Sequence, residues 1–434
     1  MSDPGSASPT PPASPARRLL PLVLPAIVVG IGSSLALMAL TAVAGVLEDW
    51  IWTTLPSSLG VAADAPWWIF VVLTLTGVAV GLVVTFVPGH AGPDPATIEL
   101  GGAPLPPAVL PGIALAIILV LAGGVSLGPE NPIIGITIGL AVAFGTRLLP
   151  ALGAGAWAAL AFSGTIGAMF GTPVAAALAL SETPGDPRVP LWDRLFAPLV
   201  AAGAGALTTD IFNGESFAIA VTPYPGPQPL DLLSSSVVAV GAALIGMAAI
   251  FLFPISWRLF QRLGRPLVAL TVGGAILGLL GAVGGEVTLF KGLRQMQELA
   301  ANAASYSAGG LAAIGLIKLL AVVVAGTSGF RGGRIFPAVF VGVAFGLAVN
   351  AYIPSVPQSL AVASALVGIL VAVTRSGWLA LFLAAFMVGE AQLMPILCVA
   401  ILPAWLVVTG RREMVISPAE AAERAGAEPA IQPA

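Results

Sequence analysis

The 434-residue chain is 58% hydrophobic and only 9% charged, whereas an ordinary soluble domain is about 25% charged. Its formal net charge is −3 and no stripe of basic side chains runs along it, which excludes a nucleic-acid-binding surface. Cys398 is the single cysteine and His90 the single histidine, so an internal disulfide, a thiolate cluster and a His/Cys metal site are excluded. The composition predicts a multi-pass protein of the lipid bilayer, without a metal or cofactor.

Residues 1–18 start with a stretch rich in Pro, Ser and Ala and are expected to form a disordered tail. Apolar runs follow, several of them near the length of about 20 residues that a membrane-spanning helix needs. Because some runs are short or interrupted, we expect roughly a dozen and a half helical pieces, some only half-spanning. The runs are Leu19–Leu47, Trp67–Val87, Ala108–Val125, Ile133–Leu149, Leu232–Phe253, Val268–Val283, Leu311–Ala325, Ile335–Ile353, Leu360–Val373 and Leu379–Val408.

Basic residues flank the outermost runs, Arg17 and Arg18 at one end and Arg411 and Arg412 at the other. Lys and Arg are enriched on the cytoplasmic side of membrane proteins, so both termini are predicted to be cytoplasmic. The segment 48–66 combines acidic side chains with tryptophans typical of a membrane interface. It is expected to face outward.

A Pro-rich connection, residues 213–231, divides the hydrophobic part into two membrane repeats, residues 19–212 and 232–412; residues 413–434 follow as a cytoplasmic tail. The two halves look weakly related, since the small-residue break in Phe162–Glu182 has a counterpart in Val362–Glu390. Paired broken helices are typical of inverted-repeat transporters, whose site lies where half-helices meet near the midplane. Alternatively, glycine-rich helices simply pack closely.

One carboxylate, Glu130, stands between Gly128-Pro129 and Asn131-Pro132 at a predicted break between two helices. A carboxylate at the bilayer centre costs about 2.5 to 3.5 kcal/mol on insertion scales, and such groups typically serve ion or proton movement. The alternative is an acid at a helix N-terminus without a transport role, since a negative charge is favourable there. Glu130 is therefore the leading candidate for a functional residue.

Three segments, in order, resemble signatures of the CLC family of chloride channels and proton/chloride antiporters. Gly128–Pro132 resembles the family's Gly-x-Glu-Gly-Pro gating segment, and Phe170–Leu178 is similar to its Phe-Asn-Ala-Pro-Leu-Ala-Gly segment. Ser328–Pro337 resembles its Gly-Gly-x-Phe-x-Pro loop, with Phe336 one place late. The resemblance covers most of residues 70–412. It implies an all-helical inverted repeat of broken and tilted helices, a homodimer in a bacterial inner (cell) membrane, and Glu130 as the gate.

Gly and Pro just before an apolar helix leave its first backbone N–H groups unpaired, and such N-termini bind anions. Each contributes about 0.3 to 2 kcal/mol, and weak binding at several sites suits conduction. Glu130 would compete with the transported anion for these N–H groups. The candidate anion ligands lie at two such N-termini: Gly128, Pro129, Asn131, Gly333, Arg334, Ile335 and Phe336.

The sequence departs from the family pattern at three points. The family's internal proton-transfer glutamate is the second of a Glu-Glu pair, which here reads Glu182-Thr183, so either Glu182 substitutes or proton coupling is lost. The family's Gly-Ser-Gly-x-Pro loop has Ala91–Pro95 as its nearest counterpart, which lacks the serine and leaves Gly92 as a candidate ligand. The family's coordinating tyrosine would fall near Val415.

The expected function is transport of small anions, chloride or a related halide, gated by Glu130 and either channel-like or weakly coupled to protons. The alternatives are a proton-coupled antiporter with an unrecognised internal acid and a membrane-embedded enzyme, which would need clustered reactive groups that this chain does not offer. A cation-coupled carrier would need Glu390 as a second deep acid. Lys318, inside an apolar run, is expected either to add positive potential near the pore or to reach the interface.

Overall fold

The computed structural model describes residues 15–98, 102–183, 185–186, 188–212, 217–417 and 420–421. In these ranges the chain is helical, and its one β-type pairing is an isolated bridge. The α-helices are α1 (Pro15–Asp49), α2 (Leu55–Leu59), α3 (Pro66–Phe86), α4 (Leu110–Ala122), α5 (Glu130–Leu148), α6 (Ala154–Phe170), α7 (Pro173–Ser181), α8 (Leu191–Ile211), α9 (Asp231–Gln261), α10 (Pro266–Gly284), α11 (Leu293–Ala301), α12 (Ala308–Ser328), α13 (Ile335–Tyr352), α14 (Gln358–Thr374), α15 (Gly377–Val388) and α16 (Met394–Val408). Shorter pieces are the π-helical η1 (Trp50–Thr54) and the 3₁₀ turns η2 (Pro95–Thr97), η3 (Pro107–Val109), η4 (Glu286–Thr288), η5 (Ala303–Ser305) and η6 (Ala391–Leu393).

Eight helical segments in the described ranges are long and apolar enough to cross a membrane. They comprise α1 with α2, the single helices α3, α5, α9, α10, α12 and α13, and η6 with α16. Shorter apolar helices accompany them, namely η3 with α4, α6, α14 and α15. This mixture of full-length and half-length helices confirms the expected all-helical membrane fold.

Several boundaries differ from the expectation. α1 begins at Pro15, inside the predicted tail, and helical structure continues to Leu59, so most of the expected outward loop is helix. The run expected over 379–408 is two helices, because Gly389 adopts the left-handed conformation (φ 74°) that ends α15. Residues 1–14, 418–419 and 422–434 of the two predicted tails lie outside the described residues.

Trp52 does not lie at the membrane interface, as the tryptophan-rich segment predicts, but inside the protein. Its side chain is buried, and its Nε1–H donates a hydrogen bond to the carbonyl of Ala122 at 2.9 Å. The ring also packs edge-on against Phe290, with 5.4 Å between ring centroids. Trp52 therefore ties the end of α1 to the interior, whereas Trp50 and Trp67 are exposed.

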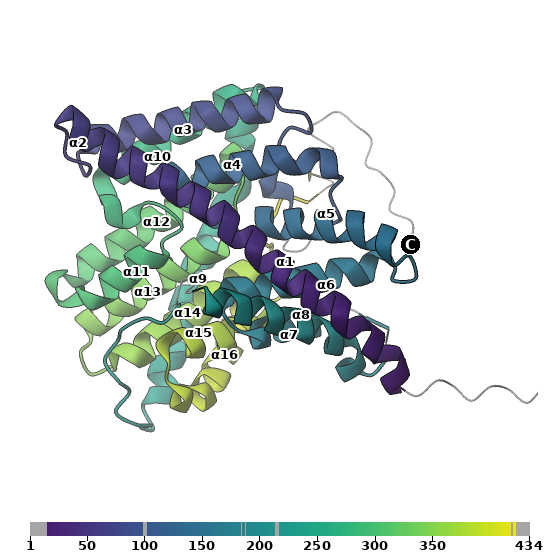
Figure 1. Ribbon diagram of the computed structural model, residues 1–434. Helices are drawn as coiled ribbons and strands as arrows, with labels where there is room; N and C mark the ends of the chain where they lie inside the picture. The colour runs from purple at the N-terminus through teal and green to yellow at the C-terminus, as the bar shows by residue number, and fades with distance from the viewer. Residues whose placement is uncertain are drawn as a thin grey trace, which may run out of the picture.

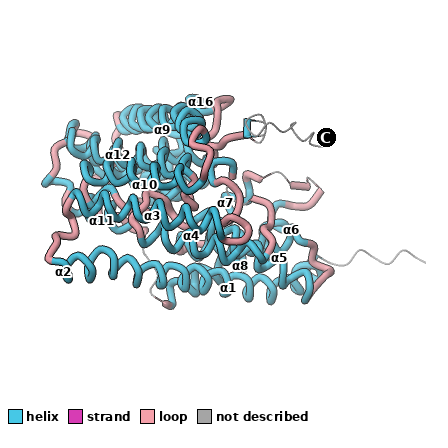
Figure 2. Tube along the Cα trace, turned by 90° about the horizontal axis from the view of Figure 1, so that it is seen from above, coloured by secondary structure: helices cyan, strands magenta, loops and turns pink. Residues whose placement is uncertain are grey.

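The helices form layers around two central helices, α13 and α14. Figure 1 shows α1 running obliquely across one face, and Figure 2 shows α1 along one side of the molecule with α9 and α16 along the opposite side. Every residue of α14 from Ser359 to Ala372 is buried, and α13 is buried over almost its whole length. A helix that is apolar and covered all round belongs to the core. The first turn of α13 is thereby held deep in the protein.

The connection between α8 and α9 is pinned to the second half of the chain. The backbone N–H of Ile219 donates to the carbonyl of Met387 at 2.9 Å, and that of Tyr224 donates to Oε1 of Glu390 at 3.2 Å. Glu390 is thus a partly exposed acceptor in a loop, not the deep second acid that a cation-coupled carrier needs. The repeat boundaries at 212 and 232 stay a prediction, and residues 213–216 lie outside the described ranges.

Glycines allow α1, α6 and α8 to pack backbone against backbone. A Cβ atom at Gly205 on α8 would collide with the carbonyl oxygen of Gly164 on α6, and one at Gly167 would collide with that of Ala202. Small residues permit such close approach of membrane helices. Gly203, two residues before Gly205 on α8, has no group outside its own helix turn within 4 Å of the place of its Cβ.

We predict that Gly205→Ala lowers the free energy of unfolding by about 1 to 3 kcal/mol, because the added methyl group forces the helices apart. Gly203→Ala is the matched control on the same helix and is expected to raise stability slightly, by up to about 1 kcal/mol, because alanine favours a helix more than glycine does. The measurement is the thermal unfolding midpoint of the detergent-solubilised protein, followed by tryptophan fluorescence. Equal midpoints for the two variants would show that α6 and α8 are not in backbone contact.

Candidate anion site

The N-termini of α5 and α13 meet at a pair of glycines. The N–H of Gly128 donates to the carbonyl of Gly333 at 2.9 Å, and the N–H of Gly333 donates to the carbonyl of Gly128 at 2.7 Å. Each glycine stands two residues before its helix and four residues before a proline, Pro132 or Pro337. Proline fits the first helical turn because its missing N–H is not needed there. The bridge thus pairs equivalent positions of two Gly-x-x-x-Pro segments, as a local two-fold relation requires.

Glu130 is the first residue of α5, and its side chain is 0% exposed. Its Oε1 accepts a hydrogen bond from the backbone N–H of Phe336, in the first turn of α13, at 2.6 Å. The carboxylate lies against both bridge glycines, since a Cβ atom at Gly128 or Gly333 would collide with it. No donor among the described residues reaches Oε2. The carboxylate therefore sits at the α13 N-terminus, where a bound anion would sit.

Two cations, Lys291 and Arg334, interact electrostatically with Glu130. The Nζ of Lys291 lies 5.8 Å from the centroid of the Phe336 ring. Arg334 precedes α13, and its Nη2 donates to the carbonyl of Ile98 at 3.2 Å. Two cations thus add positive potential at the site, while the hydrogen bond to the carboxylate comes from a backbone N–H.

Three phenyl rings pack beside the site. Phe336 stacks on Phe170 with 6.0 Å between centroids, and Phe217 lies 5.0 Å from Phe336. Phe170 ends α6 and opens the second of the three segments that carried the family resemblance. All three segments therefore lie together around Glu130 and Phe336, two residues that are 206 positions apart in the chain.

A cavity of about 1240 Å³ reaches α5 at Asn131 and Ile134. Its other wall includes the segment 410–417, which lies after α16. The N–H of Ile416 donates to the carbonyl of Ala96 at 2.8 Å, and the Ile416 side chain is buried. The first residues of the predicted C-terminal tail are thus packed against the protein, and Glu413 lines the cavity.

Gly92 belongs to a tight turn whose carbonyls bind Arg331. Gly89 to Gly92 all have positive φ angles, between 51° and 79°. Arg331 donates to the carbonyls of His90, Ala91 and Gly92 at 2.8 to 3.0 Å. The N–H of Gly92 donates to the carbonyl of Gly89 at 2.9 Å. The role of Gly92 as an anion ligand stays a prediction, since its N–H is engaged here.

Glu182 and Thr183 lie apart from this constellation. Glu182 is exposed at the end of α7, and its Oε1 accepts the N–H of Trp378 in the first turn of α15 at 2.7 Å. The hydroxyl of Thr183 donates to the carbonyl of Leu180 at 2.7 Å. These bonds do not reach α5 or α13. The structure therefore brings together the predicted residues of the two N-termini and leaves the predicted proton path separate.

Comparisons with known proteins agree with this arrangement. A family model described as voltage gated chloride channel matches residues 76–409. The putative ion-transport protein YfeO of Escherichia coli (strain K12 / DH10B) is 52% identical over 403 residues, which cover 93% of this chain and 96% of that protein. The protein of the same name from Shigella boydii serotype 4 shows the same identity and coverage.

Solved structures of the same architecture include a CLC-type fluoride/proton antiporter, with a TM-score of 0.75, 17% identity, and coverage of 92% of this chain and 97% of that one. A slow cyanobacterial Cl⁻/H⁺ antiporter has a TM-score of 0.71, 19% identity, and coverage of 90% and 95%. At these identities the likeness is one of fold. Together with the family match over most of the chain, it makes this a multi-pass membrane protein of the voltage-gated chloride channel (CLC) family, whose members are channels and transporters rather than enzymes.

Proposed function

We propose that the protein carries small inorganic anions across a bacterial inner membrane along a path that Glu130 gates, with chloride as the favoured substrate. The observation that supports this most is the 2.6 Å hydrogen bond from the Phe336 N–H to the Glu130 carboxylate. A helix N-terminus offers the same N–H groups and the same partial positive charge to a chloride ion as to a carboxylate. The side chain and the anion therefore compete for one place.

The carboxylate is held weakly enough to leave. A buried carboxylate needs several kcal/mol of compensation. Glu130 receives the 2.6 Å hydrogen bond from the Phe336 N–H, weaker interactions with the backbone N–H groups of Glu130 and Ile335, and the fields of two cations at a distance; helix-dipole interactions add about 0.3 to 2 kcal/mol each. An incoming anion can take over these interactions when Glu130 swings away or is protonated. Exchange of this kind is what conduction requires.

We favour a channel-like or weakly proton-coupled path. Thr183 does not ionise near neutral pH, and Glu182 is exposed and already accepts the N–H of Trp378. Tight coupling is the second candidate, because the structural relatives include proteins named as fluoride/proton and Cl⁻/H⁺ antiporters. In that case Glu413, which shares a cavity with Asn131, is the best-placed internal acid. A homodimer and cytoplasmic termini remain part of the proposal.

Glu130→Gln is predicted to raise chloride efflux about tenfold, because a neutral amide is held less firmly at a helix N-terminus that favours a charge by up to about 2 kcal/mol. Efflux from proteoliposomes is measured with a chloride electrode while a pH electrode follows protons, and any proton movement should be lost. Asp210→Asn, at the exposed end of α8, is the control. If the Glu130→Gln variant shows the same chloride efflux as the wild type, Glu130 is an acid at a helix N-terminus without a role in gating.

Gly333→Ala is predicted to lower efflux, because the new methyl group would occupy the place that the Glu130 carboxylate and the anion share. In a Glu130→Ala background, where the carboxylate is absent, the same substitution should still lower efflux, which a double-mutant cycle would measure. Efflux that Gly333→Ala leaves unchanged in the Glu130→Ala background would mean that the anion does not use this place.

Glu182→Gln is predicted to leave chloride efflux within about twofold of the wild type, while destabilising the protein by about 1 kcal/mol through the weaker acceptor at the start of α15. Glu413→Gln is the companion variant. Both are assayed for proton uptake driven by a chloride gradient. Uptake in the wild type that one variant abolishes would establish antiport and identify its internal acid.

A further inference from the structure

Lys318 is a buried cation to which the proposed gating gives no role. It lies in the middle of α12 and its side chain is 0% exposed, so it does not reach the membrane interface. Ionisable side chains inside membrane proteins are costly and typically functional. Its Nζ donates hydrogen bonds to the carbonyls of Thr288, Leu289 and Phe290 at 3.0, 2.7 and 2.6 Å. Because an ammonium has three donors, its hydrogen-bonding capacity is fully used on this one turn, the 288–290 turn.

The 288–290 turn holds the loop that leads to Glu130. The N–H of Phe290 donates to the carbonyl of Gly124 at 2.9 Å, and the hydroxyl of Ser126 donates to the carbonyl of Thr288 at 3.0 Å. Gly124 and Ser126 both belong to the loop between α4 and α5, and Glu130 is the first residue of α5. The Thr288 carbonyl therefore accepts two hydrogen bonds, one from the buried ammonium and one from the loop before the gate.

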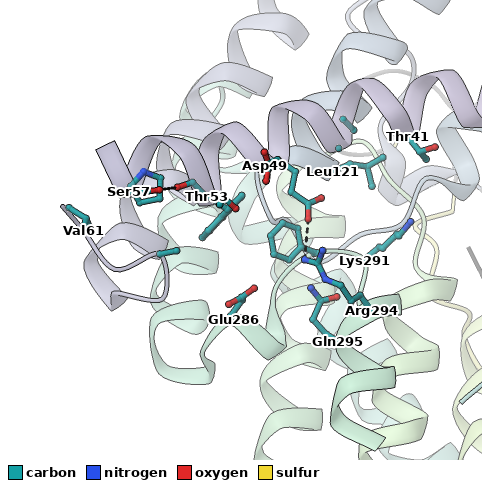
Figure 3. Close-up of a pocket in the computed structure, with 17 residues that line it drawn as sticks. Thr41, Asp49, Thr53, Ser57, Val61, Leu121, Glu286, Lys291, Arg294 and Gln295 are labelled. Carbon is teal, nitrogen blue, oxygen red and sulfur yellow. Dashed lines mark hydrogen bonds and ion pairs between the residues drawn. The ribbon is translucent and has the colours of Figure 1, made fainter. Parts of the chain in front are cut away.

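The 288–290 turn is a fixed element of the fold. Figure 3 shows Glu286 and Lys291, which flank the turn, together with Leu121 of α4 on the walls of a cavity of about 640 Å³. Within the turn, Phe290 has a positive φ angle of 58°, a conformation that strains a bulky residue and persists only where neighbouring contacts enforce it. Those contacts are the hydrogen bonds of its N–H and its carbonyl, and the ring of Trp52 at 5.4 Å between centroids.

Lys318 also contacts the second helix of the site. Its Nζ lies 5.2 Å from the ring centroid of Phe340, and an ammonium is attracted to the face of an aromatic ring. Phe340 stands one turn after Phe336 on α13, and Phe336 donates the hydrogen bond to the Glu130 carboxylate. One ammonium is therefore in contact both with the turn that holds the loop before α5 and with the beginning of α13.

We propose that Lys318 is a positioning residue of the anion site: by holding the 288–290 turn beside Phe340, it sets how the N-termini of α5 and α13 stand to one another. The inference rests on the proposed anion transport. A compact ammonium suits this role because it satisfies three carbonyls that converge on one point, which a neutral side chain of the same length cannot do. Without it the buried carbonyls would lack a donor, and the turn would shift to recover hydrogen bonds.

The first experiment separates a shift of the site from a loss of stability. The full-length Lys318→Met variant is reconstituted into proteoliposomes, and its chloride transport rate is measured over a range of chloride concentrations. We expect the half-saturating concentration to rise about fivefold, the change that follows when about one hydrogen bond to the anion is lost. Gly205→Ala, on a helix that gives no residue to the site, is the control for lowered stability and should leave this concentration within about twofold. An unchanged half-saturating concentration in an active Lys318→Met protein would overturn the proposal.

Ser126→Ala tests the same connection without removing the charge, and it decides the question if Lys318→Met does not fold. It breaks the hydrogen bond between the loop and the turn, and we expect the half-saturating concentration to rise about threefold. Combined with Lys318→Met, it should add less than about twofold, because both variants break one connection. Ser235→Ala, which removes one hydroxyl of the buried Ser235–Ser364 pair at 2.7 Å, is the matched control and should leave the concentration unchanged.

Two further outcomes are informative. An unchanged half-saturating concentration in the Ser126→Ala variant, or effects of the two variants that simply multiply, would show that Lys318 does not act on the site through the 288–290 turn. A wild type without any anion flux would instead refute the proposed function.

Discussion

The paired glycines at Gly128 and Gly333 are the constraint on which the site depends. An anion inside a bilayer needs positive charge, yet a fully charged ligand would hold it too tightly for transport. Two helix N-termini supply partial charge, provided that both point at one spot deep in the protein. The reciprocal hydrogen bonds between the two glycines fix that spot, and only residues without a Cβ leave room there for a carboxylate.

The rest of the fold keeps these N-termini in place. α13 and its neighbour α14 are covered on nearly all sides, so the first turn of α13 cannot shift without disturbing the core. Arg331, in the loop that precedes α13, binds the carbonyls of the turn at 89–92 and so ties that turn to the loop. Movement at the site is thereby left to one side chain, Glu130, whose carboxylate is held by backbone N–H groups, Phe336 first among them, and whose Oε2 meets no donor within hydrogen-bond distance among the described residues. A rigid frame around one exchangeable group is a sound basis for a gate.

The sequence predicts the local features well, because Gly and Pro mark helix starts directly. Glu130 and both N-termini were found in this way. Partners distant in the chain were not predicted: the sequence does not show that Gly128 pairs with Gly333, or that Lys291 lies beside Phe336. The same limit explains why the roles of Lys318 and Glu390 were misread: each role depends on backbone groups far away in the chain that the side chain binds. The apolar runs do not predict α8, because Asp193, Arg194 and Pro198 interrupt its apolar pattern.

The contacts of four cations, Lys291, Lys318, Arg331 and Arg334, divide them into two groups. Arg331 and Lys318 spend their donors on backbone carbonyls, four for Arg331 and three for Lys318. They are therefore structural, because their hydrogen-bonding capacity is largely used within the protein. Lys291 and Arg334 interact electrostatically with Glu130. On the proposed path their charge would draw an anion toward the site while backbone N–H groups coordinate it, and this separation of attraction from coordination would allow the ion to leave again.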